Sequence, residues 1–325
     1  MLKTKYINIF IIGDCMLKKS AYKRIIIATL ALIILGLLYF FPENNDKEIK
    51  ESLSYIDVET TPIYLIDNNE YVARTNILKT EKDSIKLAKE ILESLIIGSK
   101  KNDYIPEGFK AIIPANTKIL DISLENKLLK VNFSKELLNI SDKNAEKMLE
   151  AIIYSLTEIE EIESIMIFID GEKLTKLPNN NNLLPNVLDR SFGINKIYDL
   201  TSFKNVNSIT SYYLSKHNDN YYYVPVTKVS NNNKEKIEVI IEELKTAPIN
   251  QTNLISFLAT NVELTEYEIL EDSISLSFNN YVFDNFSEKS ILEEVKYSIA
   301  LSIRDSYDIK NISFNVDGVQ VAAVN

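Results

Sequence analysis

Residues 167–171 read IFIDG, and residues 314–318 read FNVDG. In both places an apolar run meets an Asp-Gly pair, a combination that predicts a strand followed by a tight turn. The likeness continues toward the N-terminus, because residues 61–171 return in the same order as residues 209–318, about 145 to 149 positions later. A duplication of this length predicts two copies of one structural unit.

The first copy predicts a hairpin, two helices and several strands. Strand-like runs on either side of Asn68 and Asn69 favour a hairpin, and apolar residues at helical spacing predict helices over 84–96 and 144–158. Gly98 lies where the first of these helices is expected to stop. The strand candidates are 111–114, 118–124, 128–133 and 164–169.

The second copy predicts the same elements in the same order. They are hairpin strands at 212–215 and 221–229, helices at 234–245 and 288–304, and strands at 255–259, 263–270, 273–278 and 309–316. Two helices packed on a mixed sheet in each copy make an α+β fold of two tandem small α/β sandwich domains.

Length and composition allow two cores, because the chain has 325 residues and 46% of them are hydrophobic. Cys15 is the only cysteine, so there is no disulfide framework and no Cys-based zinc site. The net charge is −10, but residues 1–24 carry +5, which leaves −15 on residues 42–325. Such an acidic surface repels phosphate backbones, and we expect no nucleic-acid partner.

Residues 25–41 form an uninterrupted apolar run. Seventeen residues at about 1.5 Å each are near the lower limit for crossing a bilayer core of about 30 Å. Basic residues precede the run and acidic residues follow it, which predicts a cytoplasmic N-terminus. We therefore expect a single-pass signal anchor in the cell membrane, with the C-terminal domains outside the cytoplasm.

Three other interpretations of the N-terminus stay open. A cleaved signal peptide needs small residues after the apolar run, and LLYFFPE at 37–43 offers none. IIGDC at 11–15 resembles the end of a lipobox, which would lipidate Cys15, although Asp14 and the long apolar run after it argue against this. Met16 is an alternative start that would remove Cys15 altogether.

The predicted organisation has six segments. They are a basic cytoplasmic tail (1–24), the transmembrane anchor (25–41), a polar stalk (42–59), a first domain (60–177), an asparagine-rich linker (178–206) and a second domain (207–325).

We identify no catalytic, cofactor-binding or metal-binding residues in the sequence. The seven glycines form no phosphate-cradling or dinucleotide-binding pattern. His217 lies in SKHNDN, so we expect an exposed turn residue rather than a general base, and the chain has no second histidine for a catalytic triad. An acidic run is typical of a solvated helix end rather than a cation site; its members are Glu158, Glu160, Glu161 and Glu163.

Two further features have ordinary structural interpretations. Asp170 and Asp317 occupy equivalent places in the two copies, but each precedes a glycine after a strand and therefore predicts a turn. Tyrosines gather at 212–213 and 221–223, where they could stack on sugars or bases. Alternating tyrosines on a hairpin more often pair across strands and cover the sheet. We therefore expect a protein that is not an enzyme and has no cofactor.

One ordered series of short runs in the first copy resembles the GerMN domain of GerM-type sporulation and spore germination proteins. The runs are LIIG (95–98), IPANTKIL (113–120), VNFSKEL (131–137), SLTE (155–158) and IFIDG (167–171). The resemblance covers nearly all of residues 60–320, with a looser fit in the second copy. Its motifs are structural rather than catalytic.

The resemblance implies an envelope-anchored protein of endospore formers. Its paired GerMN domains would be similar to ring-building modules and would act in the channel complex between mother cell and forespore. The chain departs from the family in three places. Family members are often lipoproteins, the proline expected after Gly98 is Ser99, and the second copy has Ala247 and Pro248 in place of the glycine and also lacks the Ile-Pro pair.

We expect a non-enzymatic, membrane-anchored envelope protein that acts as a scaffold or assembly component in sporulation or germination. Its expected partners are the membrane, other sporulation envelope proteins and further copies of itself in a homo-oligomer or ring. The alternative is an extracytoplasmic ligand-binding module that senses cell-wall fragments or germinant-related molecules through the tyrosine-rich hairpin. An envelope hydrolase that uses carboxylates such as Asp170 is disfavoured by the missing catalytic set.

Overall fold

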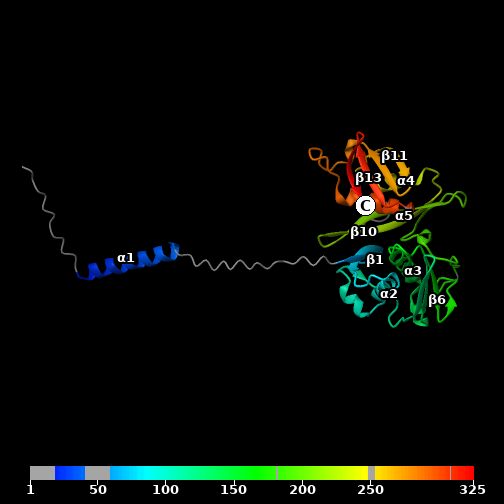
Figure 1. Cartoon of the computed structure of the whole chain (residues 1–325), viewed down its shortest axis with the longest axis horizontal. Helices are drawn as coiled ribbons and strands as arrows, with labels where there is room; N and C mark the ends of the chain where they lie inside the picture. Colours follow the sequence, from blue (N-terminus) through cyan, green and yellow to red (C-terminus); the bar gives the residue numbers. More distant parts are fainter. Residues whose placement is uncertain (1–18, 41–58, 181, 248–252, 308) are drawn as a thin grey trace, which may run out of the picture. The chain divides into compact units, whose positions relative to one another are not determined.

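The computed structural model describes residues 19–40, 59–180, 182–247, 253–307 and 309–325. The chain divides into two compact units, residues 1–57 and residues 58–325. The first contains the helix α1 (Lys19–Phe40), and the second contains all other helices and strands (Figure 1). Cys15, Met16, Pro248 and the stalk over 42–58 lie outside the described residues.

Helix α1 contains most of the predicted apolar run. The side chains of residues 23–35 are exposed to solvent. Within the described residues, however, no helix combines the length and the apolar character that crossing a membrane requires. The structure therefore does not support the predicted span, and the membrane anchor stays a proposal.

The first repeat opens with the predicted hairpin, which consists of β1 (Thr60–Asp67) and β2 (Val72–Leu78). The predicted helix follows as α2 (Ser84–Leu95), and it begins where the Asp83 side chain accepts a hydrogen bond from the backbone N–H of Lys86. The remaining elements are β3 (Phe109–Lys110), β4 (Ile119–Glu125), β5 (Leu128–Phe133), α3 (Asp142–Leu156), β6 (Ser164–Ile169) and β7 (Glu172–Lys173).

The second repeat has the same order of helices and strands, except that no strand corresponds to β3. They are β9 (Asn207–His217), β10 (Asn220–Ser230), α4 (Lys236–Leu244), β11 (Leu264–Leu270), β12 (Ser273–Phe278), α5 (Glu293–Ser306), β13 (Asn311–Val316) and β14 (Val319–Val324). Two predicted strands, 111–114 and 255–259, are wrong. In their place single bridges join Ile113 to Ile96 and Ile255 to Leu214.

The central strands of the two repeats form sheets of identical topology. Their orders are β4-β5-β6-β7 and β11-β12-β13-β14, and the middle pair of each is parallel. A parallel pair needs a crossover connection, which α3 and α5 supply. Asp170 and Asp317 have φ angles of 48° and 51°, and the glycines after them also have positive φ. This confirms the predicted turns, because Asp-Gly is the pair that tolerates two left-handed residues.

The two hairpins do not join the sheets of their own repeats, and this corrects the predicted architecture of one sheet in each sandwich. They combine into a third sheet of order β3-β1-β2-β10-β8, in which β9 also pairs with β10. In Figure 1, β1 and β10 lie between the helices of the first repeat and those of the second. An isolated hairpin is marginally stable, and β2 pairs with β10 at Arg74 and Tyr223, which joins the two hairpins into one sheet.

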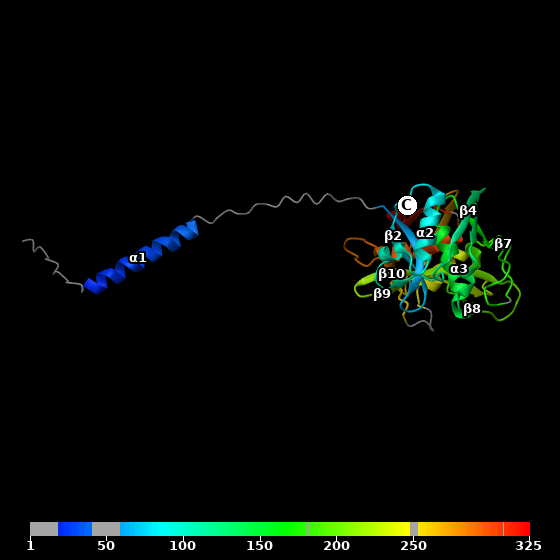
Figure 2. The same ribbon diagram turned by 90° about the horizontal axis from the view of Figure 1, so that it is seen from below.

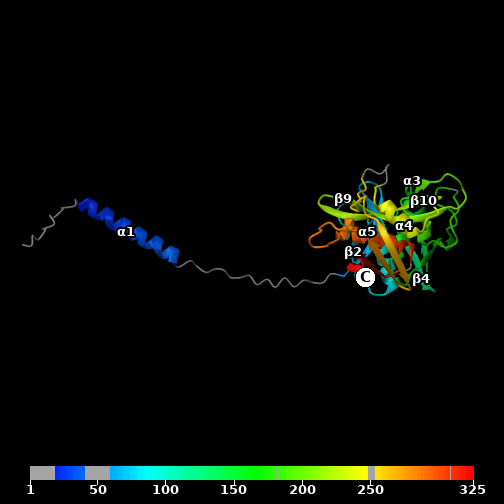
Figure 3. The same ribbon diagram turned by 90° about the horizontal axis from the view of Figure 1, so that it is seen from above.

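Each repeat also contributes to the core of the other. Tyr212 of β9 belongs to the apolar core of the first repeat, and Ala73 of β2 belongs to that of the second. Figure 2 shows the two helices of the first repeat, α2 and α3, side by side, and Figure 3 shows β9 and β10 crossing α4 and α5 of the second repeat. The repeats are therefore parts of a single compact unit.

The segment predicted as a linker takes part in the packing. It contains the short helix η3 (Arg190–Phe192) and the strand β8 (Ile197–Asp199), which pairs in parallel with β10. The side chain of Asn195 accepts a hydrogen bond from the backbone N–H of Val72 and donates to the carbonyls of Val72 and Pro225. One asparagine thus bonds to the backbones of both hairpins.

Candidate functional site

His217 is the last residue of β9, close to its predicted place in a turn. Its ring is packed rather than freely exposed: the side chain is 27% accessible, and Nε2 lies 4.0 Å from Glu107 Oε1. Nδ1 lies 3.3 Å from Asn68 Nδ2. A Cβ added to Gly108 would come within 2.7 Å of the ring. The absence of a side chain at Gly108 therefore makes room for the imidazole.

The acidic run behaves as predicted only in part. The side chains of Glu160 and Glu163 are 77% and 64% exposed, as expected of a solvated helix end. For Glu158 the prediction is wrong, because its side chain is only 15% exposed. It follows the end of α3, at the point where that helix meets the second repeat. Among the described residues, no group of three or more His, Cys, Asp or Glu side chains could hold a metal ion.

Most of the clustered tyrosines face the protein interior. Tyr212, Tyr213 and Tyr222 are buried, whereas Tyr221 is 43% exposed. The Tyr222 hydroxyl donates to Asp67 Oδ2 at 2.8 Å, a bond between the two hairpins. The burial of three of them agrees with the prediction that these tyrosines cover the sheet, although no tyrosine lies opposite another between β9 and β10.

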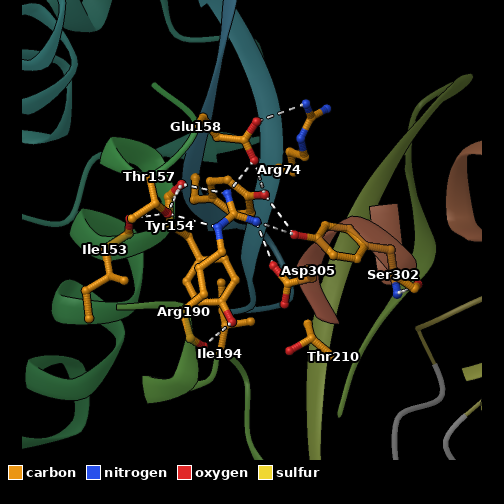
Figure 4. Close-up of polar contacts among 12 residues, drawn as sticks. Arg74, Ile153, Tyr154, Thr157, Glu158, Arg190, Ile194, Thr210, Ser302 and Asp305 are labelled. Carbon is orange, nitrogen blue, oxygen red and sulfur yellow. Dashed lines mark hydrogen bonds and ion pairs between the residues drawn. The ribbon is translucent and has the colours of Figure 1, made fainter. Parts of the chain in front are cut away.

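A buried polar network joins the two repeats around Arg190 (Figure 4). Arg190 Nη2 donates to Glu158 Oε1 at 2.7 Å, and Nη1 donates to Asp305 Oδ1 at 2.6 Å. Glu158 follows α3, and Asp305 lies in the last turn of α5, so the two carboxylates come from corresponding helix ends. One guanidinium from the connecting segment therefore binds a carboxylate of each repeat.

Two tyrosines complete what we call the Arg190 network, which consists of Arg190, Glu158, Asp305, Tyr64 and Tyr212. Tyr64 of β1 and Tyr212 of β9 have their hydroxyl oxygens 2.9 Å apart. The Tyr64 hydroxyl donates to Glu158 Oε1 at 2.8 Å. Because a hydroxyl has one proton to donate, the Tyr212 hydroxyl must be the donor in the bond between the two tyrosines.

The same hydrogen bond positions the tyrosine in each repeat. The backbone N–H of Tyr64 donates to Ser155 Oγ on α3, and that of Tyr212 donates to Ser302 Oγ on α5, both at 2.9 Å. In each repeat, the second helix is therefore bonded to the first strand at the same point. The duplication has brought equivalent residues face to face, with Arg190 between the two helix ends.

Burial and the nearby arginines shift the pKa values of the acidic groups in the Arg190 network in different directions. Burial alone would raise the pKa of Glu158, but Arg190 and Arg74 outweigh it and lower that pKa to about 2. Burial raises the pKa of the Asp305 carboxyl, against the opposing effect of Arg190. Burial also raises the pKa values of the Tyr64 and Tyr212 hydroxyls, which keeps both protonated, as their donor roles require.

The geometry of Arg190 is that of a structural clamp. Its Nε donates to Thr157 Oγ1 at 2.9 Å, so Nε and both Nη atoms each have an acceptor. The guanidinium also lies 5.0 Å from the centre of the Tyr154 ring, within the range of a cation–π contact. These contacts hold the side chain in one position and fix the repeats relative to each other.

Beside the network lies an open groove of about 910 Å³. Both repeats and the connecting segment line it. Its lining includes Arg74, Glu158, Ile159, Arg190, Leu301 and Arg304.

Sequence reasoning missed this site for two reasons. Arg190 lies in a segment with linker composition, and Glu158 lies in an acidic run that is typical of a surface. One signal was available, because Glu158 and Asp305 are acidic residues at corresponding helix ends of the two copies. Nothing in the sequence places Arg190 between them.

Comparison with known proteins adds a family match. The family model described as Germane, sporulation and spore germination, matches residues 62–175 and 210–322. These two matches fall on the two copies of the duplicated unit.

A sequence relative and a solved structure are similar over most of the chain. The chain is 31% identical over 265 residues to the spore germination protein GerM of Bacillus subtilis (strain 168), a stretch that covers 79% of this chain and 71% of that protein. The structure of the tandem GerMN domains of the sporulation protein GerM from Bacillus subtilis matches with a TM-score of 0.73 at 28% identity. It covers 80% of this chain and 92% of that one.

Proposed function

We propose a function from the premise that this chain belongs to the Germane family of sporulation and spore germination proteins, as its five short runs predict. Family membership supports a role in sporulation or germination. Our proposal is that the chain fills this role as a non-enzymatic scaffold of the cell envelope, in which the two repeats form one rigid assembly surface.

The Arg190 network is the observation that carries this proposal. Interfaces between domains of one chain usually permit relative motion. Here a shared sheet and a buried guanidinium with a carboxylate from each side oppose such motion. A repeated assembly needs subunits whose contact surfaces keep a fixed relative orientation, since each interface must close on the next. A locked pair of domains meets that need.

Open sheet edges offer surfaces for lateral contact. β4 and β11 are edge strands of their sheets, and each exposes a large apolar side chain, Leu120 at 49% and Ile269 at 46%. Unpaired edges are natural sites for association with another chain. We propose that other envelope proteins of sporulation, or further copies of this chain, bind there.

The proposed location is the cell membrane, with residues 25–41 as the anchor and residues 58–325 outside the cytoplasm. During sporulation this places the repeats in the space between the two membranes. The apolar run and the charges that flank it support this location.

The alternative function, ligand sensing through the tyrosine-rich hairpin, has less support. Tyr212, Tyr213 and Tyr222 are buried, so this hairpin presents little aromatic surface. An aromatic platform for sugars needs exposed ring faces. We therefore do not propose this function for the hairpin.

Deletion of the gene with scoring of heat-resistant spores tests the proposal. Complementation should succeed with the wild type and with Lys82→Gln, an exposed control, and should fail with Arg190→Met at equal protein level. Cross-linking in sporulating cells should capture the chain with envelope proteins or with itself. A strictly monomeric chain with no captured partner, normal spores in the deletion strain, or a lytic band in zymography of the full chain would contradict it.

A further inference from the structure

Arginine is rare in this chain and is concentrated at one place. It occurs only at Arg24, Arg74, Arg190 and Arg304, within a total of 36 lysines and arginines. Arg74, Arg190 and Arg304 all line the groove between the repeats, and they come from β2, η3 and α5. Arginine presents a planar fork of donors that fits a carboxylate, whereas lysine is a point charge. The groove therefore differs chemically from the lysine-rich remainder of the surface.

Two of these arginines, Arg74 and Arg304, have few anionic partners among the described residues. Arg190 binds Glu158 and Asp305 at short range. Arg74 Nη2 lies 3.4 Å from Glu158 Oε2, on a carboxylate that Arg190 already binds more closely. Arg304 Nη2 donates to the backbone carbonyls of Lys310 and Val324 rather than to a carboxylate.

The positive charge of Arg304 is incompletely compensated, and it lies near that of Arg74. The Nε atoms of both side chains are buried without a hydrogen-bond partner among the described residues. Burial lowers the pKa of Arg304, and the nearby charge of Arg74 lowers it further. Two guanidinium groups that repel each other are stabilised by an anion that contacts both.

The rest of the groove limits the kind of anion. Its volume of about 910 Å³ suits a small molecule. Ile159, Leu301 and Ile309 supply apolar lining, and acidic side chains also line the groove, among them Glu160 and Glu163. Nearby acidic charges disfavour polyanions, because repulsion grows with the ligand's charge.

We propose that this groove binds a small molecule that has a single carboxylate on an apolar body. The carboxylate contacts Arg74 and Arg304, and the apolar body packs against Ile159 and Leu301. The sheet edges proposed for assembly do not line this groove, so ligand binding and edge contacts can be tested separately.

Nuclear magnetic resonance of the arginine side chains tests the proposal directly. The four arginines give four Nε–H signals in the full ¹⁵N-labelled chain, purified in mild detergent and assigned with Arg74→Lys and Arg304→Lys. Titration with benzoate should shift the Arg74 and Arg304 signals in a saturable way and leave Arg24 unchanged. Absence of any saturable shift of the arginine signals at millimolar benzoate would overturn the proposal, and that outcome is read from the wild-type spectrum alone.

Related probes separate the contributions to binding. Acetate should bind more weakly than benzoate because it lacks the apolar body, and benzyl alcohol should not shift the signals because it lacks the charge. Stronger binding of inorganic phosphate than of benzoate, or equal effects of benzyl alcohol and benzoate, would contradict a carboxylate site.

Affinity measurements on variants add a second readout. Arg74→Gln and Arg304→Gln should each weaken benzoate binding by at least about tenfold, as expected for the loss of a charge-assisted hydrogen bond. Lys82→Gln removes a positive charge from an exposed side chain and should leave the affinity unchanged. Equal affinity in all three variants would also count against the site.

Discussion

Tyr64 and Tyr212 occupy equivalent positions in the two repeats, and their hydroxyl oxygens meet at 2.9 Å in the buried interface. Each tyrosine is held by a serine of its own repeat, Ser155 or Ser302, through the same backbone hydrogen bond. The duplicated chain thus builds an interface like that of a two-fold dimer, in which the same residue of both partners meets near the axis. Arg190 breaks this symmetry, because the chain has one connecting segment and not two.

We predict that the two tyrosine hydroxyls are energetically coupled. Tyr64→Phe should lower the free energy of unfolding by about 1–3 kcal/mol, because the buried Glu158 loses a donor. Tyr212→Phe should lower the free energy of unfolding by a smaller amount, since Tyr64 still donates to Glu158. In urea unfolding, the loss of free energy of unfolding in the double variant should differ from the sum of the losses in the two single variants by at least about 0.5 kcal/mol. Tyr281→Phe, at a residue that is 54% exposed, is the control, and strict additivity would contradict the coupling.

Replacement of Arg190 should strongly destabilise the chain. Arg190→Met leaves two buried carboxylates without their shared partner and should cost about 3–5 kcal/mol in urea unfolding. Arg190→Lys should recover only part of this loss, because an ammonium group cannot reproduce the planar fork that reaches both carboxylates. Lys82→Met, at an exposed ion pair, should cost less than about 1 kcal/mol. A cost for Arg190→Met as small as that of the control would show that the network is not a clamp.

The contribution of Glu158 to stability should disappear in acid. Its folded-state pKa of about 2 lies below the ordinary value of 4.5, so the folded state binds fewer protons than the unfolded state. The stabilisation is complete above about pH 5 and is lost as the pH falls from 4.5 toward 2. The difference in free energy of unfolding between wild type and Glu158→Gln should shrink by up to about 3 kcal/mol over this window.

The matched control is Glu163→Gln, at a side chain that is 64% exposed. The free energy of unfolding of this variant should stay within about 1 kcal/mol of the wild-type value at every pH. Carboxylates that lie far from the substituted residue titrate equally in wild type and variant, so they cancel from each comparison. If the difference in free energy of unfolding between wild type and Glu158→Gln is the same at pH 6 and pH 3, Glu158 does not have the lowered pKa that we assign to it.

Two glycines with similar backbone angles should respond differently to alanine. Gly98 has a φ of 78° with nothing near its missing Cβ, so Gly98→Ala should cost about 1 kcal/mol of conformational energy. Gly108 has a φ of 91°, and a Cβ added there would lie 2.7 Å from the His217 ring, so Gly108→Ala should cost at least about 1 kcal/mol more. Thermal unfolding of both variants measures the difference.

The excess cost at Gly108 should depend on the imidazole. In the double variant with His217→Ala, the clash is gone and the cost of Gly108→Ala should fall to that of Gly98→Ala. If His217→Ala leaves the cost unchanged, the contact between the ring and Gly108 does not limit this position.

Local patterns were sufficient to predict most elements of each repeat. The spacing of apolar residues located α2, α3 and α4, and the Asp-Gly pairs located the turns after β6 and β13. These features depend on neighbours within a few residues, which is why a single sequence reveals them. The duplication itself, and the family that it points to, could also be read directly from the order of short runs.

The assembly of the two repeats was not visible in the same patterns. An alternating hairpin looks the same whether it joins the sheet of its own repeat or pairs with a hairpin about 150 residues away, as β2 does with β10. Glu158 looks like its exposed neighbours Glu160 and Glu163, and Arg190 looks like part of a linker. Whether a charge is buried depends on which distant surfaces meet, and that is settled by packing between repeats rather than by local sequence.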